Sequence, residues 1–215
     1  MKKISVVFCA ALLACTMISS SALADISLPE QASTGGEGIF DLIERRASGT
    51  RGSFPDGDVS DAELATVLWA ATGRNRNDSG WTVPLAGGRP PYVKVYAVRR
   101  DGVFLYDWKN HSLAEVSKKN ALGDITGDAF VKASPVVLVL VSDPSNLGNM
   151  ARLNDGNSLA YTAAGAMSQN AYLAADSLGI STRYMVSMNL DGVKRELKLK
   201  DGETPLCIMP IGKRK

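Results

Sequence analysis

The sequence predicts an α+β fold in which helices cover a mostly antiparallel sheet. Three observations predict it. Residues 135–141 (PVVLVLV) are apolar at consecutive positions, which is typical of a strand covered on both faces. The segments 93–98 and 103–108 flank an Asp-Gly pair, a hairpin signal. Residues 158–178 have the period of a long helix, so helices, a hairpin and a buried strand must pack as layers.

Two shorter helices are expected before the hairpin. Residues 37–46 (EGIFDLIERR) have a helical pattern of apolar positions. Ser60 and Glu63 form a capping box at the start of the next helix, because each side chain can satisfy a free backbone N–H of the other. We expect Gly73 to end that helix in a left-handed conformation.

The expected long helix has small side chains along one side. This pattern predicts either a tightly packed central helix or a helix-mediated dimer, and Gly179 can end the helix. The residues on that side are Ala160, Ala164, Met167, Ala171, Ala174 and Leu178. Between the second helix and the hairpin, we expect a functional loop over 74–91. The remaining expected elements are a strand over 182–188, a helix near 191–199 and a strand over 204–211.

The first 24 residues are expected to be a secretory signal peptide. Two lysines precede a largely apolar run over 4–18, and Ala22-Leu23-Ala24 is a typical cleavage pattern. The run is too short for a stable transmembrane anchor. The segment 12–15 weakly resembles a lipoprotein site, so a lipid on Cys15 is the alternative. We therefore expect an exported protein, periplasmic or secreted, with a flexible lead-in over 25–36 and one domain over 37–215.

Charge and residue counts exclude several classes of function. The leader carries two lysines and no acidic residue, so the mature chain would hold 22 basic and 22 acidic residues. This balance gives no electrostatic case for nucleic-acid binding. Cys207 would be the one remaining cysteine, which excludes an internal disulfide, and its apolar surroundings predict a buried thiol.

The chain also lacks the residues for several kinds of active site. His111 is the only histidine and is expected in an exposed turn, so neither a His-rich zinc site nor a hydrolytic triad is favoured. There is no phosphate-binding G-x-x-x-x-G-K-[ST] loop and no G-x-G-x-x-G after a strand. Any chemistry is therefore expected to come from a bound group.

Seven stretches of the chain, in order, resemble the nitroreductase superfamily of flavoproteins. The resemblance is strongest to the branch related to azoline-oxidising, thiazole- and oxazole-forming dehydrogenases. It covers most of residues 38–213, and the order of the stretches is more specific than any one of them. They are ERRASGTRGSF, SDAELATVLWAATG, WTVPLAGGRPPYVKVYAV, VFLYDWKNHSL, DAFVKASPVVLVLV, GAMSQNAYLAADSLGIST and PLCIMPIGK.

The resemblance implies a role for the arginines at 45–51. In the family, an Arg-x-Ser segment after the first helix binds the phosphate and part of the ring of FMN, and Arg46-Ala47-Ser48 matches it. Arg45 and Arg51 are further candidates. A guanidinium offers two parallel donors to a phosphate, and the Ser48 hydroxyl can bind the pyrimidine edge of the flavin. The alternative interpretation of this segment is an ordinary solvated loop.

The loop 82–88 both matches and departs from the family. Relatives usually have Pro-Ser-Ala followed by an Asn that reaches the flavin. Here Pro84 matches, Leu85 replaces the Ser, and Gly88 replaces the Asn. Both replacements remove a side-chain hydrogen bond, so backbone contacts from Ala86 and Gly87 would have to serve.

Two further contacts are implied by the resemblance. Backbone N–H groups near Val186 and Ser187 would face the N5 side of the flavin. Lys213, close to the end of the chain, would approach the phosphate.

Together with the expected signal peptide, the resemblance implies an exported FMN-dependent oxidoreductase, acting on a small organic substrate as a homodimer with FMN between the subunits. The fold expected from the resemblance is a nitroreductase-like sandwich around the long helix. Two alternatives are a flavin- or metabolite-binding protein without turnover, and a structural protein without a cofactor.

Overall fold

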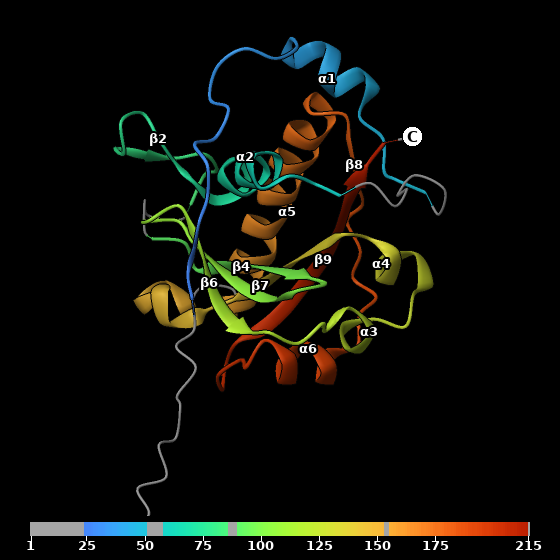
Figure 1. Cartoon of the computed structure of the whole chain (residues 1–215). Coiled ribbons are helices and arrows are strands. Elements are labelled where there is room, and N and C mark those ends of the chain that lie inside the picture. The colour runs from blue at the N-terminus through green and yellow to red at the C-terminus, as the bar shows by residue number, and fades with distance from the viewer. Residues whose placement is uncertain (1–23, 51–57, 86–89, 153–154, 215) are drawn as a thin grey trace, which may run out of the picture.

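A seven-stranded antiparallel sheet forms the centre of the computed structural model, which describes residues 24–50, 58–85, 90–152 and 155–214 (Figure 1). The strand order is β1-β6-β5-β4-β7-β9-β8, and each neighbouring pair runs antiparallel. The strands are β1 Ile26–Ser27, β4 Val93–Arg99, β5 Gly102–Asp107, β6 Ser112–Ser117, β7 Val136–Ser142, β8 Ile180–Thr182 and β9 Thr204–Lys213.

Helices cover both faces of this sheet. The buried side chains of α2 and α5 belong to one apolar core, and those of α3, α4 and α6 belong to the other. The α-helices are α1 Ile39–Arg45, α2 Asp61–Thr72, α3 Leu122–Ile125, α4 Ala129–Ala133, α5 Asp155–Ser177 and α6 Leu190–Glu196. Two 3₁₀ turns, η2 Pro144–Asn146 and η3 Gly148–Arg152, lead into α5. The expected α+β sandwich is confirmed.

Strand β7 lies in the middle of the sheet and is buried at every position. Successive side chains of a strand point to opposite faces. Leu138 and Leu140 accordingly enter the core under α2 and α5, whereas Val137 and Val139 enter the core under α3 and α6. The expectation that both faces of this strand are covered is confirmed.

The alanine-rich side of α5 packs inside the chain. Ala160, Ala164, Met167 and Ala171 are buried in the core that α5 shares with α2 and the sheet. Small side chains allow this close approach of helix to helix. The first alternative, a tightly packed central helix, therefore describes these residues.

The ends of α2 differ in how well they were predicted. The capping box is present, since Ser60 Oγ accepts from the backbone N–H of Glu63 and the Glu63 carboxylate accepts from that of Ser60. The left-handed cap at Gly73 was wrong, because its φ is −83°. The Gly73 carbonyl accepts a hydrogen bond from the N–H of Thr82 at 3.1 Å. This bond keeps the backbone extended at Gly73, and the chain continues directly into β2, Arg74–Asn75. A left-handed glycine does follow α5, since Gly179, two residues after Ser177, has φ 67°.

The predicted loop over 74–91 contains a small hairpin. Strand β2, Arg74–Asn75, pairs with β3, Gly80–Trp81. The pattern was missed because each strand has only two residues. The three tryptophans of the chain gather here: the Arg74 guanidinium lies over the rings of Trp81 and Trp108, and the Trp69 indole donates to the Arg74 carbonyl.

The predicted strand over 182–188 was misplaced, because β8 is Ile180–Thr182, and strands β1 and β6 were missed. Pairing with β9 stops at Thr182, and beyond it Met185 makes an isolated bridge to Ile208. The strand ends there because the N–H of Tyr184 is bound by the side chain of Tyr172. Strand β6 was missed because its mixed sequence, SLAEVS, has no clear alternation; pairing with β5 decides its conformation.

His111 lies in a turn, as expected, but it is half-buried and both of its ring nitrogens have partners. Its Nδ1 lies 2.8 Å from the Tyr106 hydroxyl, and its Nε2 lies 2.9 Å from the Pro29 carbonyl. The ring therefore ties the turn before β6 to the lead-in. That lead-in also contributes β1 and the buried side chain of Leu28.

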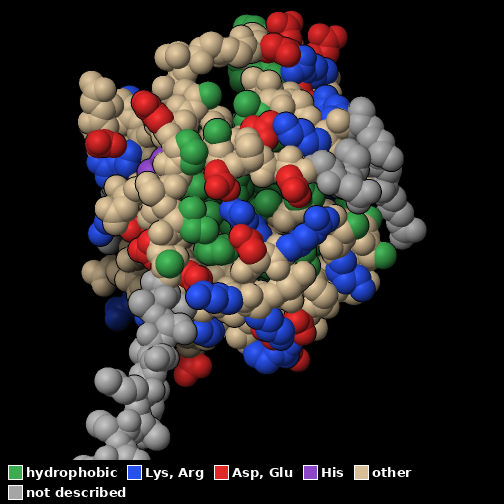
Figure 2. Space-filling view, in the orientation of Figure 1, with side chains coloured by type: hydrophobic (Ala, Val, Ile, Leu, Met, Phe, Trp, Pro, Cys, Tyr) green, Lys and Arg blue, Asp and Glu red, His purple; other side chains and the backbone are tan. Residues whose placement is uncertain are grey.

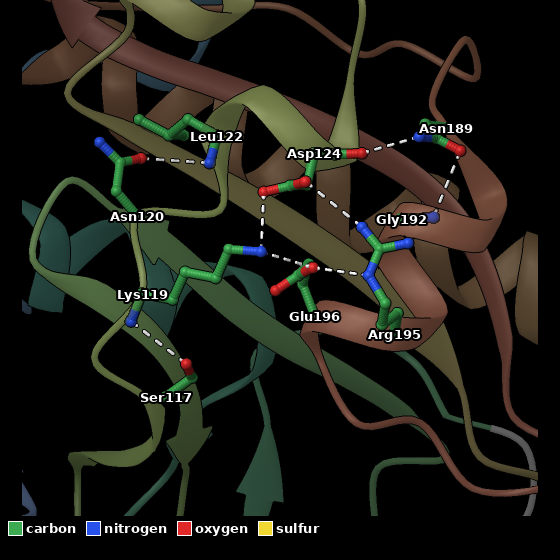
Figure 3. A network of polar contacts seen from close by, with 9 residues as sticks. All are labelled: Ser117, Lys119, Asn120, Leu122, Asp124, Asn189, Gly192, Arg195 and Glu196. Carbon is green, nitrogen blue, oxygen red and sulfur yellow. Dashed lines mark hydrogen bonds and ion pairs between the residues drawn. The ribbon is translucent and has the colours of Figure 1, made fainter.

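An ion-pair network joins α3 to α6 on the far side of the sheet (Figure 3). Lys119 bridges the carboxylates of Asp124 and Glu196, and Arg195 contacts the same two groups. The Asn189 side chain bonds the Asp124 carbonyl and caps α6. These contacts hold the two short helices close together.

We expect Gly192→Ala to destabilise the protein by about 1–3 kcal/mol, the usual cost of overpacking. A Cβ at Gly192 would lie 2.0 Å from the backbone oxygen of Asp124. Gly165→Ala is the matched control, because a Cβ there meets nothing within 4 Å. It should stabilise α5 by about 0.5–1 kcal/mol. Urea unfolding of both variants checks the pair, and equal stabilities would contradict this packing of α3 on α6.

Candidate flavin-binding site

The segment after α1 lies beside β8. Arg46 follows the helix with extended backbone angles, and two residues later the chain reaches Ser48. The N–H of Gly49 donates to the carbonyl of Thr182 at 2.8 Å, and the Arg183 guanidinium donates to the carbonyl of Gly49 at 3.2 Å. The arginine-rich segment is therefore fastened to the end of the sheet at both its N–H and C=O groups.

Tyr172 of α5 lies beneath this segment. Its side chain is buried, and the guanidinium carbon of Arg46 lies 5.0 Å from its ring centroid. Its hydroxyl is 2.8 Å from Ser48 Oγ and accepts from the backbone N–H of Tyr184 at 2.7 Å. We call the group of Arg46, Ser48, Tyr172 and Arg183 the cradle.

The arginines around the cradle differ in whether a carboxylate already neutralises their charge. Arg45 pairs with Glu37 and with Asp176, where its Nε lies 2.5 Å from the carboxylate. Asp176 also holds Arg214. By contrast, neither Arg46 nor Arg183 pairs with a carboxylate among the described residues. These two guanidinium groups are the ones left with charge for a ligand.

Asp176 is almost fully buried and holds this corner of the molecule together. Burial by itself would raise the pKa of its carboxyl, but hydrogen bonds from Arg214 and Arg45 outweigh burial and lower the pKa below 3.8. Asp176 therefore stays ionised at neutral pH. The pKa of the Arg45 guanidinium is raised in turn, foremost by the hydrogen bond that it donates to Asp176 and then by the one that it donates to Glu37.

Lys213 is engaged in a contact of its own. Its Nζ lies 2.5 Å from the Glu63 carboxylate, in the first turn of α2. Burial would raise the pKa of Glu63, but Lys213 and the capping serine Ser60 bond its ionised form and lower the pKa. An approach of Lys213 to a phosphate would have to compete with this ion pair.

The backbone segment expected at the flavin N5 side is open to solvent. Val186 is 65% exposed, and Ser187 is exposed too. Both follow the Tyr184 N–H that Tyr172 holds. The cradle and this segment thus meet through one side chain of α5.

The loop expected to match Pro-Ser-Ala lies at the other end of α2. Pro84 is exposed, and Leu85 is half-buried against the core. Both line a hollow of about 420 Å³ next to Trp81. Lys213 contacts the first turn of α2, whereas this loop follows the hairpin after its last turn. Arg51, Ala86 and Gly87 lie outside the described residues.

Tyr172 and Arg183 were missed at the level of sequence. Tyr172 is an aromatic residue in an alanine-rich helix, and a residue of this kind is ordinarily interpreted as part of the hydrophobic core. Arg183 directly follows a strand, and only the pairing of Gly49 with that strand brings it to the arginine-rich segment. A sequence signal for Tyr172 was available, because a large aromatic side chain stands out among the small side chains of this helix.

The other candidates for chemistry are Cys207 and clusters of metal-binding side chains. The predicted burial of Cys207 is confirmed, and burial raises the pKa of its thiol to about 12. Within the described ranges, no three His, Cys, Asp or Glu side chains are grouped to hold a metal ion. In those same ranges, no helix has the length and apolarity to span a membrane. Figure 2 shows acidic and basic side chains intermingled on the face in view.

Comparison with known proteins places this geometry in a family. The nitroreductase family model matches residues 43–213. A proposed nitroreductase from Methanocaldococcus jannaschii is 30% identical over 186 residues, which cover 80% of this chain and 89% of the relative. The chain therefore belongs to the nitroreductase family, and it is a nitroreductase-family oxidoreductase.

Solved structures agree on the fold. A proposed nitroreductase from Ralstonia eutropha JMP134 superposes with a TM-score of 0.80 at 28% identity, covering 89% of this chain and 90% of that one. A chain of the E. coli microcin synthetase complex has a TM-score of 0.62 at 17% identity, covering 97% of this chain and 85% of its own. The expected nitroreductase-like sandwich is confirmed, and the likeness to the microcin synthetase concerns the fold.

We expect Asp176→Asn to destabilise the protein by about 2 kcal/mol at pH 7, because hydrogen bonds to charged groups are lost. The folded pKa of Asp176 lies below its unfolded value, so its stabilisation is present above pH 3.8 and is lost as the pH falls through the folded pKa. The stability difference between wild type and variant should therefore shrink below about pH 4. Urea unfolding across this range measures it, and a constant difference would show that the carboxylate charge contributes nothing.

Proposed function

We propose that this protein is an FMN-dependent oxidoreductase whose cradle holds the phosphate end of the cofactor. The observation that carries the proposal is the Arg46 guanidinium, which lies over the ring of Tyr172, the same tyrosine whose hydroxyl contacts Ser48, and has no carboxylate partner among the described residues. A phosphate is the natural partner of a fixed, uncompensated guanidinium. Members of the nitroreductase family generally bind a flavin, and one protein of this fold is described as an oxidoreductase containing FMN.

The residues of the cradle fit an anionic cofactor. Arg46 and Arg183 would contribute positive charge, and Ser48 would contribute a hydroxyl to the phosphate or to the pyrimidine edge of the flavin. The backbone at Val186 and Ser187 would face the reactive side of the ring. The flavin would supply the transfer of hydride or electrons, and the protein would bind and orient it.

A homodimer would complete the site. Loop residues Pro84 and Leu85 follow the last turn of α2, whereas Lys213 contacts its first turn, and a helix of this length is about 18 Å long. A flavin between two copies could meet the cradle of one and the loop of the other. Exposed apolar side chains at Ile39, Phe40 and Ile43 of α1, and at Val186, are suitable for such an interface.

The substrate is proposed to be a small organic molecule. Export to the periplasm, or secretion, would follow from the signal peptide. Nicotinamide cofactors are scarce outside the cytoplasm, so oxidation of a substrate or electrons from a membrane carrier would suit such a protein.

Leu85 favours a second candidate function, a flavin- or metabolite-binding protein without turnover. A leucine in place of serine cannot donate a hydrogen bond, and its side chain packs against the core instead. Weak binding at this loop could leave a flavin bound but not reduced.

The visible absorption spectrum of residues 25–215, before and after FMN addition and desalting, separates these functions. A retained flavin band supports a cofactor site, and bleaching by an electron donor then supports turnover. A retained band that no donor bleaches favours the binding protein. A folded, colourless protein after FMN addition would overturn the cofactor proposal.

We expect Arg46→Ala to weaken FMN binding by about 2 kcal/mol or more, the scale of a lost charge-assisted hydrogen bond. Arg183→Ala should weaken it in the same direction. Arg100→Ala is the control, because that arginine contacts Asp58 and the Ala133 carbonyl instead of the cradle. Isothermal titration with FMN measures all three. Equal affinities for wild type and both cradle variants would place the phosphate elsewhere.

A further inference from the structure

Tyr172 connects the two segments that the proposed flavin site requires. The segments are Arg46–Thr50 after α1 and Arg183–Ser187 after β8, which are more than 130 residues apart in the chain. Tyr172 contacts the first through Arg46 and Ser48 and the second through the Tyr184 N–H. Its side chain is only 7% exposed, so its position is set by the packing of α5.

The direction of the hydrogen bonds follows from counting protons. A backbone N–H can only donate, so the Tyr172 oxygen accepts from Tyr184. The phenolic hydrogen then needs an acceptor, and among the described residues the Ser48 Oγ at 2.8 Å is the one in contact. A buried hydroxyl left without an acceptor is costly. The chain of donors therefore runs from the Tyr184 N–H to the Tyr172 hydroxyl and on to Ser48.

This direction fixes what Ser48 can do. Its oxygen accepts from Tyr172, so its own hydrogen is free to be donated. No other contact of Ser48 is present among the described residues. Donors arranged in series polarise one another, which makes the last hydroxyl a better donor. Ser48 is exposed and shares Tyr172 with the Arg46 guanidinium, so its hydroxyl is set to bind an acceptor oxygen that carries negative charge.

We propose that Tyr172 is a positioning residue that orients the Ser48 hydroxyl as a hydrogen-bond donor to an acceptor oxygen of the bound cofactor. This inference rests on the proposed FMN function. The acceptor is either a phosphate oxygen or a carbonyl oxygen of the flavin, and both are acceptors without a proton to give.

A double-mutant cycle on FMN affinity tests the proposal. Tyr172→Phe keeps the ring under Arg46 and removes only the hydroxyl. We expect Tyr172→Phe and Ser48→Ala each to raise the Kd for FMN about tenfold. Because both remove the same donor, Ser48→Ala should change the Kd less than about threefold in the Tyr172→Phe background. Equal factors in both backgrounds would overturn the proposal.

The coupling between Tyr172→Phe and Ser48→Ala distinguishes a positioning role of Tyr172 from a merely structural one. If Tyr172 only stabilised the fold, its loss would lower the stability but leave the effect of Ser48→Ala unchanged. Tyr106→Phe is the matched control, since it deletes another buried hydroxyl that is bonded at 2.8 Å, to His111 Nδ1. It should leave the Kd for FMN unchanged. Urea unfolding confirms that each variant is folded.

Riboflavin, which lacks the phosphate, identifies the acceptor. If the cycle shows coupling with FMN but neither variant affects riboflavin binding, the acceptor is a phosphate oxygen. If riboflavin shows the same coupling, the acceptor is a flavin carbonyl; either result supports the proposal. Wild-type protein that binds no FMN would overturn the proposed function and this inference together, whereas tight FMN binding without coupling would overturn this inference alone.

Discussion

The complete burial of β7 is the constraint on which the rest of the structure depends. A strand with apolar side chains on both faces can be stable only if each face is covered. The chain meets this requirement by placing α2 and α5 on one side and α3, α4 and α6 on the other. The neighbouring strands β4 and β9 pair with β7 along its length, so their ends are fixed by it as well. The cradle is built at one such end, where β8 extends the sheet beyond β9.

The packing of these layers holds the residues of the cradle in place. Helix α5 is held close to α2 by small side chains, and from this fixed helix Tyr172 reaches the segments on either side of it. Asp176, one turn further along α5, binds Arg45 and Arg214 and so fastens the end of α1 and the end of the chain to the same helix. A single helix thus orders both the charged and the uncharged parts of the candidate site. Because folding already orders these groups, binding a ligand there costs little further conformational entropy.

Pairing among the charges decides which residues remain available for an anion. The sequence offers many basic residues near the candidate site, and by composition alone they are equivalent. In the structure, Arg45, Arg214 and Lys213 contact carboxylates, whereas Arg46 and Arg183 do not within the described ranges. A guanidinium stacked on a tyrosine ring keeps its full hydrogen-bonding capacity, which is why Arg46 is the strongest candidate.

Local patterns in the sequence determined the class of fold and most of its elements. The apolar run of β7, the capping box of α2 and the period of α5 each depend on interactions between near neighbours or on simple burial, so they can be read from residues in order. The resemblance of seven ordered stretches to nitroreductases likewise depends on the chain alone, and the family match agrees with it. Arg46 and Ser48 were predicted as binding residues from this resemblance.

Only the tertiary structure decided what joins those residues to the rest of the site. The strand predicted over 182–188 ends at Thr182 in the structure, and nothing local shows that Tyr172 binds the Tyr184 N–H beyond it. The left-handed cap at Gly73 was wrong because a bond from Thr82 pulls the chain into extended form. Arg183 and Tyr172 have no motif of their own, and their roles come from contacts across more than 120 positions in the chain. The sequence by itself determined the layers and the arginine-serine motif, because these can be recognised from the order of residues along the chain. The hydrogen-bond and ion-pair partners of each charge and hydroxyl depend on long-range packing, which no local pattern records.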